Sequence, residues 1–126
     1  GMTRYYRGVL AIYQQDNDKA LRLLEDSKDI NYAIALLNKN KVKEALNVLK
    51  DLDQGFPYVL YSTGVAYGRL NENAKAAEYK AKAYQIDPSL RLLDKEIHFP
   101  KPDESLLPEE RGLNHFPLKF YTCQTP

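Results

Sequence analysis

The fold of this 126-residue chain is decided by a stretch near its middle, residues 64–76, which read GVAYGRLNENAKA. Two earlier stretches align with it without a gap: residues 8–20, GVLAIYQQDNDKA, and residues 33–45, AIALLNKNKVKEA. Each stretch opens with glycine or alanine, continues with a β-branched residue and closes on alanine. Internal repetition of this kind predicts a repeat architecture in which every unit has the same local structure.

A cluster of polar, turn-forming residues occupies the middle of each stretch, at residues 15–17, 38–40 and 71–73. Such clusters between periodic apolar segments indicate loops. We therefore predict a helix, a tight turn and a second antiparallel helix, three times over. The small residues at the two ends of each stretch would let the paired helices approach closely, since only a hydrogen atom or a methyl group would lie between their backbones.

The segments after the closing alanines have the apolar spacing of helices. Leucine or valine follows both Ala20 and Ala45 at intervals of one, three and four residues, which places the apolar side chains on one helical stripe. The second helix of the third unit is expected over residues 74–86. No segment shows the strict apolar–polar alternation of a strand, so an all-α fold is expected.

Prolines mark the boundaries of the third unit. Pro57 suits the first turn of a helix, where its missing N–H would be unpaired anyway. Asp87 precedes Pro88 and closes the unit, because proline disfavours helix in the residue before it. Ser89 is predicted to cap a further short helix over residues 90–97, with leucine and isoleucine on one side.

The third unit resembles the tetratricopeptide repeat family over residues 57–88, and the resemblance extends more weakly back to Tyr5. The unit departs from the family at three positions. It has Leu60 where the family usually has tryptophan and Thr63 where leucine is usual. It has Lys80, with Tyr79 beside it, where the second helix usually has an aromatic residue. The aligned stretches begin 25 and then 31 residues apart, against about 34 for the family, so some helices or turns must be shorter. Sel1-like and other helical-hairpin repeats fit as alternatives. The residues that carry the resemblance are Gly64, Tyr67, Ala76, Ala83 and Pro88.

The resemblance implies a short right-handed superhelical solenoid of about three helix-turn-helix repeats over residues 3–97, which ends in the C-terminal cap helix. Residues 98–126 differ, because Pro100 and Pro102 remove backbone donors and fix φ. We expect a proline- and phenylalanine-rich irregular tail whose apolar residues pack on the repeats and cover their open end. The alternatives are a strand that docks on another molecule and a disordered remnant.

The composition of the chain argues against several classes of partner and environment. Eighteen basic and 17 acidic residues give a net charge of +1, which argues against nucleic acid or an anionic membrane as the partner. No apolar run approaches the roughly 18 residues needed for membrane insertion. The single cysteine excludes an internal disulfide. The sequence is compatible with either the cytoplasm or the periplasm as the compartment of this protein.

Residues for catalysis are few. His98, His115 and Cys123 could be imagined as a base and a nucleophile, but nothing near them in the sequence would orient the imidazole or stabilise an oxyanion. Their spacing is not that of metal ligands either. We therefore expect no enzymatic activity, no metal site and no cofactor.

The resemblance also implies a concave surface lined by the first helix of each unit. That surface would be apolar and rich in tyrosine, which is typical of an interaction site; the alternative is that some of these residues pack against neighbouring helices or lie under the tail. Family members that clamp a chaperone's C-terminal carboxylate have lysine and asparagine at positions held here by tyrosine, valine and isoleucine, so this role is not expected. The groove positions, carried over to this chain, are Tyr5, Val9, Ile12, Tyr13, Ile30, Ile34, Leu37, Asn38, Tyr58, Tyr61, Val65 and Arg69.

The leading hypothesis is a non-enzymatic protein–protein interaction module that binds a peptide or partner protein, of unknown identity, through this groove. The alternative is a structural segment of a larger tetratricopeptide-containing protein, secreted or of the cell envelope, with no ligand of its own. Self-association through the ends of the solenoid or through the tail is left open.

Overall fold

The computed structural model describes residues 2–92, and in this range all the regular secondary structure is helical. The all-α prediction is confirmed for these residues. The predicted tail, residues 98–126, and the cap helix beyond residue 92 lie outside them. The elements are α1 (Met2–Tyr13), α2 (Asn17–Leu24), α3 (Ile30–Asn38), α4 (Val42–Leu49), α5 (Pro57–Arg69), α6 (Asn73–Ile86) and the 3-10 turn η1 (Pro88–Leu90).

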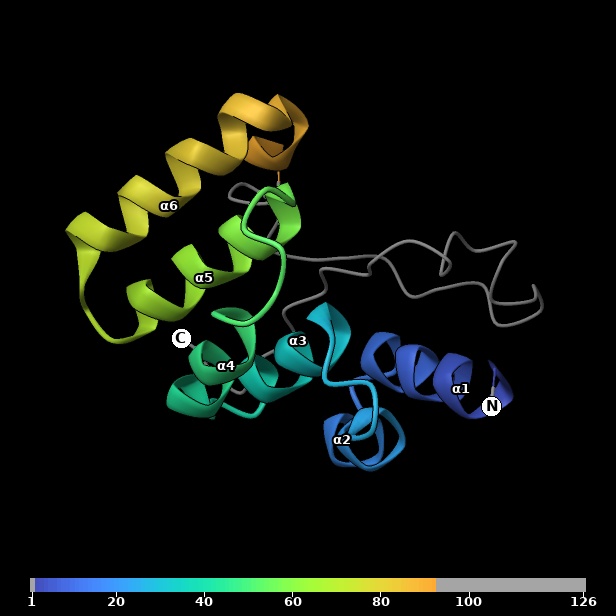
Figure 1. The fold of residues 1–126 in the computed structure, drawn as a ribbon. Helices are drawn as coiled ribbons and strands as arrows, with labels where there is room; N and C mark the ends of the chain where they lie inside the picture. The colour runs from blue at the N-terminus through green and yellow to red at the C-terminus, as the bar shows by residue number, and fades with distance from the viewer. Residues whose placement is uncertain (1, 93–126) are drawn as a thin grey trace.

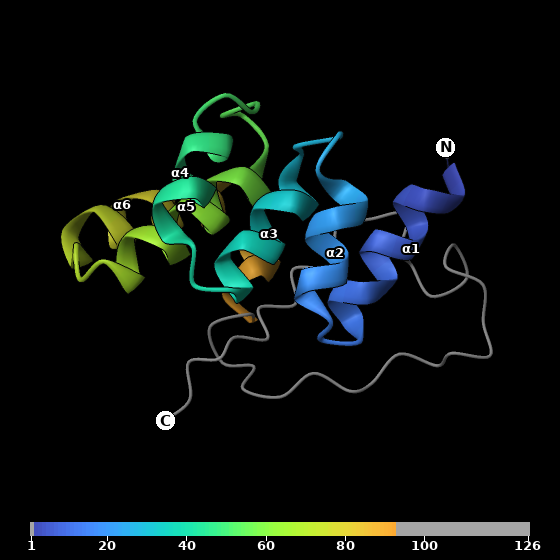
Figure 2. The ribbon, with the colours of Figure 1, turned by 90° about the horizontal axis from the view of Figure 1, so that it is seen from below.

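The helices follow one another across the molecule in chain order, with α1 at one end and α6 at the other (Figures 1 and 2). Helix α1 packs on α2, α3 on α4, and α5 on α6, so consecutive helices form hairpins. Neighbouring hairpins contact each other through α2 and α3, and then through α4 and α5. Because α3 and α5 also touch, the second and third hairpins share two lines of contact.

The turns inside the three hairpins have the same backbone geometry. Each contains one residue in the left-handed region, at equivalent places in the aligned stretches: Gln15 (φ 64°), Asn40 (φ 60°) and Asn71 (φ 62°). In each turn the next residue donates its N–H to the carbonyl five residues earlier, at 2.9 Å for Asp16, 2.8 Å for Lys41 and 3.0 Å for Glu72. This bond is the one that ends a helix in the Schellman motif. The aligned stretches therefore encode a common turn.

The small residues that open and close the aligned stretches are buried where paired helices meet. In the third hairpin the close approach involves backbone atoms. A Cβ atom added at Gly64 would lie 2.7 Å from the Cγ of Lys80 and only 3.1 Å from the backbone oxygen of Ala76. The α5 and α6 backbones are thus too close for a side chain at this position. The six buried residues are Gly8, Ala20, Ala33, Ala45, Gly64 and Ala76.

The predicted boundaries of the third hairpin are largely confirmed. Pro57 begins α5, and α6 ends at Ile86, directly before Asp87 and Pro88. The prediction that Ser89 caps the next helix is wrong, because the following element begins one residue earlier, at Pro88. Asp87 is the capping residue, and its Oδ1 atom accepts hydrogen bonds from the Ser89 N–H at 3.1 Å and the Ser89 hydroxyl at 2.6 Å.

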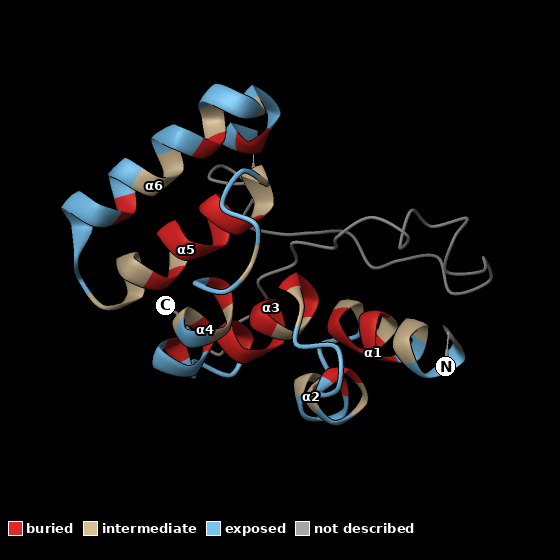
Figure 3. Cartoon of the chain, viewed as in Figure 1, coloured by how far each residue is buried: buried red, intermediate tan, exposed pale blue. Residues whose placement is uncertain are grey.

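The core follows the centre of the row of helices (Figure 3). Helix α3 is buried at every position except Tyr32, because α2, α4 and α5 all contact it. Full burial of a leucine or isoleucine contributes about 1.5–3 kcal/mol, so α3 anchors the described part of the chain. Helix α6 contacts α5 on one side only and buries just Ala76 and Ala83. None of the described helices is long and apolar enough to cross a membrane.

Candidate functional site

The predicted groove residues lie on α1, α3 and α5, and most of them are buried. Seven belong to the interior: Val9, Ile12, Ile30, Ile34, Leu37, Asn38 and Tyr61. Five are half-buried: Tyr5, Tyr13, Tyr58, Val65 and Arg69. The buried apolar members pack within the two apolar clusters of the core. Their role in binding stays a prediction, while their contribution to packing is visible in the structure.

Tyr5 takes part in a polar network between α1 and the start of α3. Its hydroxyl donates to Asp29 Oδ2 at 2.7 Å and accepts from Asn31 Nδ2 at 2.7 Å. Asp29 also caps α3, since its Oδ1 atom accepts from the backbone N–H groups of Asn31 and Tyr32. Burial raises the pKa of Tyr5, and the hydrogen bond to the Asp29 carboxylate raises it further. The neutral phenol therefore links the first two hairpins.

Asn38 and Arg69 hold equivalent positions in the second and third aligned stretches, and both reach back to the preceding hairpin. Asn38 Nδ2 donates to Asn17 Oδ1 at 3.2 Å. The Arg69 guanidinium donates to the backbone oxygen of Leu37. These two predicted groove residues thus connect neighbouring hairpins.

Val65 and Arg69 also line a hollow of about 480 Å³ near the turns of the second and third hairpins. Two other predicted groove residues on α5, Tyr58 and Tyr61, do not line this hollow and contact aromatic rings. The Tyr58 ring lies 5.0 Å from that of Phe56, and the Tyr61 ring 6.3 Å from that of Tyr84. The structure therefore brings together only part of the predicted set. The remaining residues that line the hollow are Asn40, Gly68, Asn71 and Lys80.

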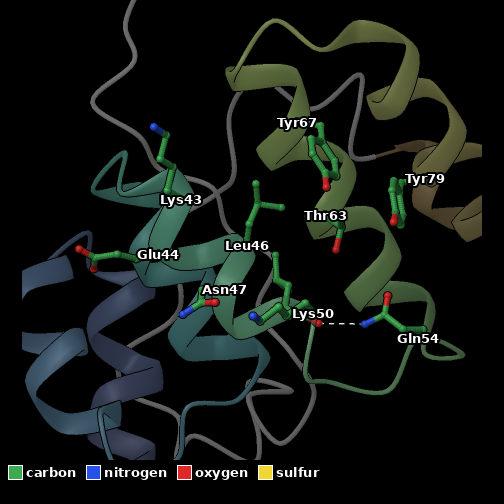
Figure 4. A pocket seen from close by; sticks show the side chains of 10 residues that line it. Lys43, Glu44, Leu46, Asn47, Lys50, Gln54, Thr63, Tyr67 and Tyr79 are labelled. Atoms are coloured by element: carbon green, nitrogen blue, oxygen red, sulfur yellow. Dashed lines mark hydrogen bonds between the residues drawn. The ribbon is translucent and has the colours of Figure 1, made fainter.

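A larger cleft, of about 700 Å³, opens between the second and third hairpins on the side of their second helices (Figure 4). It forms because α4 and α6 both pack on α5 without closing on each other. Its volume lies in the range of about 300–1,000 Å³ typical of ligand sites. The residues that line it are Lys43, Glu44, Leu46, Asn47, Leu49, Lys50, Gln54, Thr63, Tyr67 and Tyr79.

Two tyrosines form one wall of this cleft. The rings of Tyr67, from α5, and Tyr79, from α6, are stacked with their centroids 5.6 Å apart and their planes at 23°. The ammonium group of Lys75 lies 5.1 Å from the centre of the Tyr67 ring, and that of Lys82 lies 5.0 Å from the centre of the Tyr79 ring. Contacts between cations and aromatic faces stabilise such an arrangement. The wall is therefore held by ring contacts.

The polar atoms of the cleft divide into bonded and unbonded groups. Thr63 donates its hydroxyl to the Val59 oxygen at 2.8 Å, within α5, and Gln54 Nε2 donates to the Leu49 oxygen at 2.9 Å. Among the described residues, by contrast, no acceptor contacts the hydroxyls of Tyr67 and Tyr79. Figure 4 shows both hydroxyls pointing toward the end of the cleft where Gln54 lies. The unbonded groups thus share one end of the cleft.

Lys50 adds positive charge to the lining of the cleft, and Lys75 and Lys82 add it against the rings of the tyrosine wall. Within residues 2–92, neither Lys50 nor Lys82 forms an ion pair. Lys75, on the tyrosine wall, pairs with Glu72 at 3.5 Å. The one carboxylate that lines the cleft belongs to Glu44, which points away from the tyrosines in Figure 4. The cleft therefore offers hydrogen-bond donors and positive charge in excess of acceptors.

Sequence reasoning did not assign Tyr67 and Tyr79 to a site, although it singled them out for other reasons. A local signal was present, since Lys75, Tyr79 and Lys82 are spaced by four and three residues and share one face of α6. The partner ring, Tyr67, comes from the preceding helix, and its position depends on how closely α5 and α6 pack.

No protein-family model, curated protein or solved structure matches the chain. The described residues contain no group of histidine, cysteine, aspartate and glutamate side chains that could hold a metal ion. The assignment of a function therefore depends on the geometry of the helical hairpins and of the cleft.

Proposed function

We propose that this protein is a non-enzymatic interaction module, a short tetratricopeptide-like solenoid of three helical hairpins that binds an extended segment of a partner protein. The shared turn geometry of the three hairpins supports the repeat assignment. Their chain-order arrangement, with each hairpin packed on the next, supports the solenoid.

The cleft between α4 and α6 is the observation that carries this proposal. It has the volume of a ligand site, and its tyrosine wall is half-buried, with hydroxyls that contact no acceptor among the described residues. Tyrosine is enriched in binding hot spots because it combines a large apolar ring with a polar tip. Leu46 adds a half-buried apolar side chain from α4.

We place the binding site in this cleft in preference to the predicted first-helix groove. Seven of the groove residues are buried, and a buried side chain cannot contact a partner without rearrangement. The cleft residues are held by helices that pack on α5, so the surface is preorganised and its binding would cost little ordering entropy.

The experiment is a selection of random peptides on the full chain, followed by affinity measurements on a cleft variant. Asn47 lies on the exposed side of α4 and lines the cleft, so Asn47→Trp fills it without disturbing the core. Asn73→Trp, at an exposed position outside the cleft, is the matched control. We expect the first variant to weaken the selected peptides at least about tenfold, or about 1.4 kcal/mol, and the control to leave them unchanged. Failure to select any peptide, or equal affinities for the two variants, would refute the proposal.

A further inference from the structure

We propose that the cleft between α4 and α6 recognises an acidic, leucine-containing peptide segment, in which an apolar side chain contacts the tyrosine wall and an adjacent carboxylate occupies the donor-rich end. This inference rests on the proposed function and specifies the chemistry of the partner. It follows from the hydrogen-bonding capacity, the charge and the apolar surface of the cleft.

The hydrogen-bonding capacity of the cleft is unbalanced toward donors. The Tyr67 and Tyr79 hydroxyls, the Asn47 amide and the Lys50 ammonium group can all donate, and no protein acceptor among the described residues bonds to them. A carboxylate has two oxygens and about four acceptor sites. It can therefore receive several of these donors at once, and hydrogen bonds to a charged group are stronger than neutral ones.

Charge favours the same ligand. Lys50 lines the cleft and Lys82 lies against the Tyr79 ring of the tyrosine wall, and neither is neutralised by an ion pair within residues 2–92. Glu44 is directed away from the tyrosines, and Glu72 is paired with Lys75. A ligand with carboxylates would thus meet uncompensated positive charge, which raises the association rate and excludes cationic competitors.

The apolar surface of the cleft favours a ligand that carries an apolar side chain as well as an anionic group. Leu46 faces the cleft from α4, and the stacked rings of Tyr67 and Tyr79 face it from the other side. An apolar side chain such as leucine would remove this surface from water at about 25 cal/mol per Å². A nucleic acid would not supply such a side chain, and the cleft has too few lysines to neutralise a run of phosphates. A peptide that combines leucine with carboxylates fits both parts of the cleft.

Three synthetic peptides test the inference on the full chain by fluorescence anisotropy. One has adjacent leucines flanked by glutamates, the second has glutamine in place of every glutamate, and the third has alanine in place of every leucine. We expect the first peptide to bind at least about tenfold more tightly than either of the others, and its affinity to fall as salt is raised, since exposed charges are screened.

Variants locate the interaction. Lys50→Gln should weaken the acidic peptide several-fold and leave the glutamine peptide unaffected, while the double variant Tyr67→Phe, Tyr79→Phe should have the same selective effect. Lys19→Gln, at an exposed position on α2, is the matched control and should change nothing. Equal binding of the acidic and glutamine peptides, with both blocked by Asn47→Trp, would overturn the acidic specificity while the proposed function stood.

Two other results would also overturn this inference. If no peptide is sensitive to Asn47→Trp, the cleft is not a peptide site and the proposed function fails with it. If the chain doubles in mass in sedimentation experiments, and Asn47→Trp abolishes the doubling, the occupant of the cleft is a second copy of the chain.

Discussion

The two junctions between neighbouring hairpins occupy equivalent places in the molecule but are built differently. At the first, between α2 and α3, the Asp29 side chain caps α3 and accepts a hydrogen bond from Tyr5 of α1 at 2.7 Å. At the second, between α4 and α5, Phe56 holds the cap position and makes no side-chain hydrogen bond to α5. The first junction is therefore fastened by a polar network, whereas a cleft of about 700 Å³ lies next to the second.

This difference distinguishes the features that the aligned stretches share from those that are particular to each junction. The turns inside the hairpins are the same, because they depend on short-range backbone bonds and on residues that tolerate positive φ. The junctions differ in single side chains outside the aligned stretches, such as Asp29 and Phe56. The cleft lies where the second helices of the second and third hairpins, α4 and α6, stand apart.

The largest expected effect comes from widening the third hairpin, on which the cleft depends. Gly64→Leu places a side chain where a Cβ alone would lie 3.1 Å from the Ala76 backbone oxygen. Backbone cannot move aside as a flexible side chain can, so α5 and α6 must separate. We expect a loss of about 3 kcal/mol or more in the free energy of unfolding, at the upper end of overpacking costs, measured by chemical denaturation.

Gly68→Ala is the control for this prediction. Gly68 lies one turn later on α5, and an added Cβ would be 3.8 Å from the Cβ of Ala76, an ordinary contact. Alanine in a helix interior is favoured over glycine by about 0.5–1 kcal/mol, so this variant should be as stable as the parent or more so. Equal stability of the two variants would mean that the helices do not approach as described.

A second prediction compares the junctions directly by removing one hydroxyl from each. Tyr5→Phe breaks two hydrogen bonds, one of them to the Asp29 carboxylate. Since hydrogen bonds to charged groups contribute about 1.5–3 kcal/mol and this network is only half-buried, we expect a loss of about 1–2 kcal/mol. Tyr67→Phe should change the free energy of unfolding by less than about 0.5 kcal/mol, because the Tyr67 hydroxyl has no hydrogen-bond partner among the described residues.

The measurement is urea denaturation of the two variants beside the parent. If Tyr67→Phe lowers the free energy of unfolding as much as Tyr5→Phe does, the two junctions do not differ in the contribution of their tyrosine hydroxyls.

The sequence predicts those features that depend on neighbouring residues. The alignment of three stretches, with small residues at their ends, correctly places the turns at Gln15, Asn40 and Asn71, and Pro57 correctly places the start of α5. Each of these features is set by backbone geometry within about one turn of helix. Local pattern is sufficient for them.

The candidate site could not be predicted in this way. Whether a residue such as Ile34 faces a groove or the core depends on the helix that packs against it, and α3 has neighbours on several sides. The Tyr67–Tyr79 wall likewise requires the close approach of α5 and α6, which the absence of a side chain at Gly64 permits. A single sequence shows the periodicity of each helix, but it does not show which face of the helix turns toward the neighbouring helices.

A third prediction concerns pH and the first junction. The pKa of Tyr5 is raised above its ordinary value of 10.0, chiefly by burial and then by Asp29. Because the folded state holds the phenol proton more tightly than the unfolded chain does, the stabilisation is fully present below about pH 10 and is lost as the pH rises further. We expect stability to fall more steeply above pH 10 for the parent than for Tyr5→Phe, in denaturation series at constant ionic strength.

The chain has ten tyrosines, so only the difference between the two proteins is informative. Tyr67→Phe is again the comparison variant, because it removes a phenol and leaves the hydrogen bonds of Tyr5 intact. Parallel slopes for the parent and Tyr5→Phe would show that the phenol proton of Tyr5 does not contribute to the first junction.

The smallest expected effect is that of the ion pair between Lys39 and Asp18, which also crosses the first junction. The two groups are 3.1 Å apart, but the Asp18 side chain is 77% exposed, and exposed pairs contribute only about 0.2–1 kcal/mol. Both residues lie near helix ends, where single substitutions also change interactions with the helix dipole. A double-mutant cycle with Lys39→Gln and Asp18→Asn removes these separate contributions. We expect a coupling of about 0.5 kcal/mol or less at low salt that vanishes at high salt, because a screened surface charge cannot fasten the junction. A salt-independent coupling above about 1.5 kcal/mol would instead assign the closure of the first junction to charge and reduce the importance of the Tyr5 network.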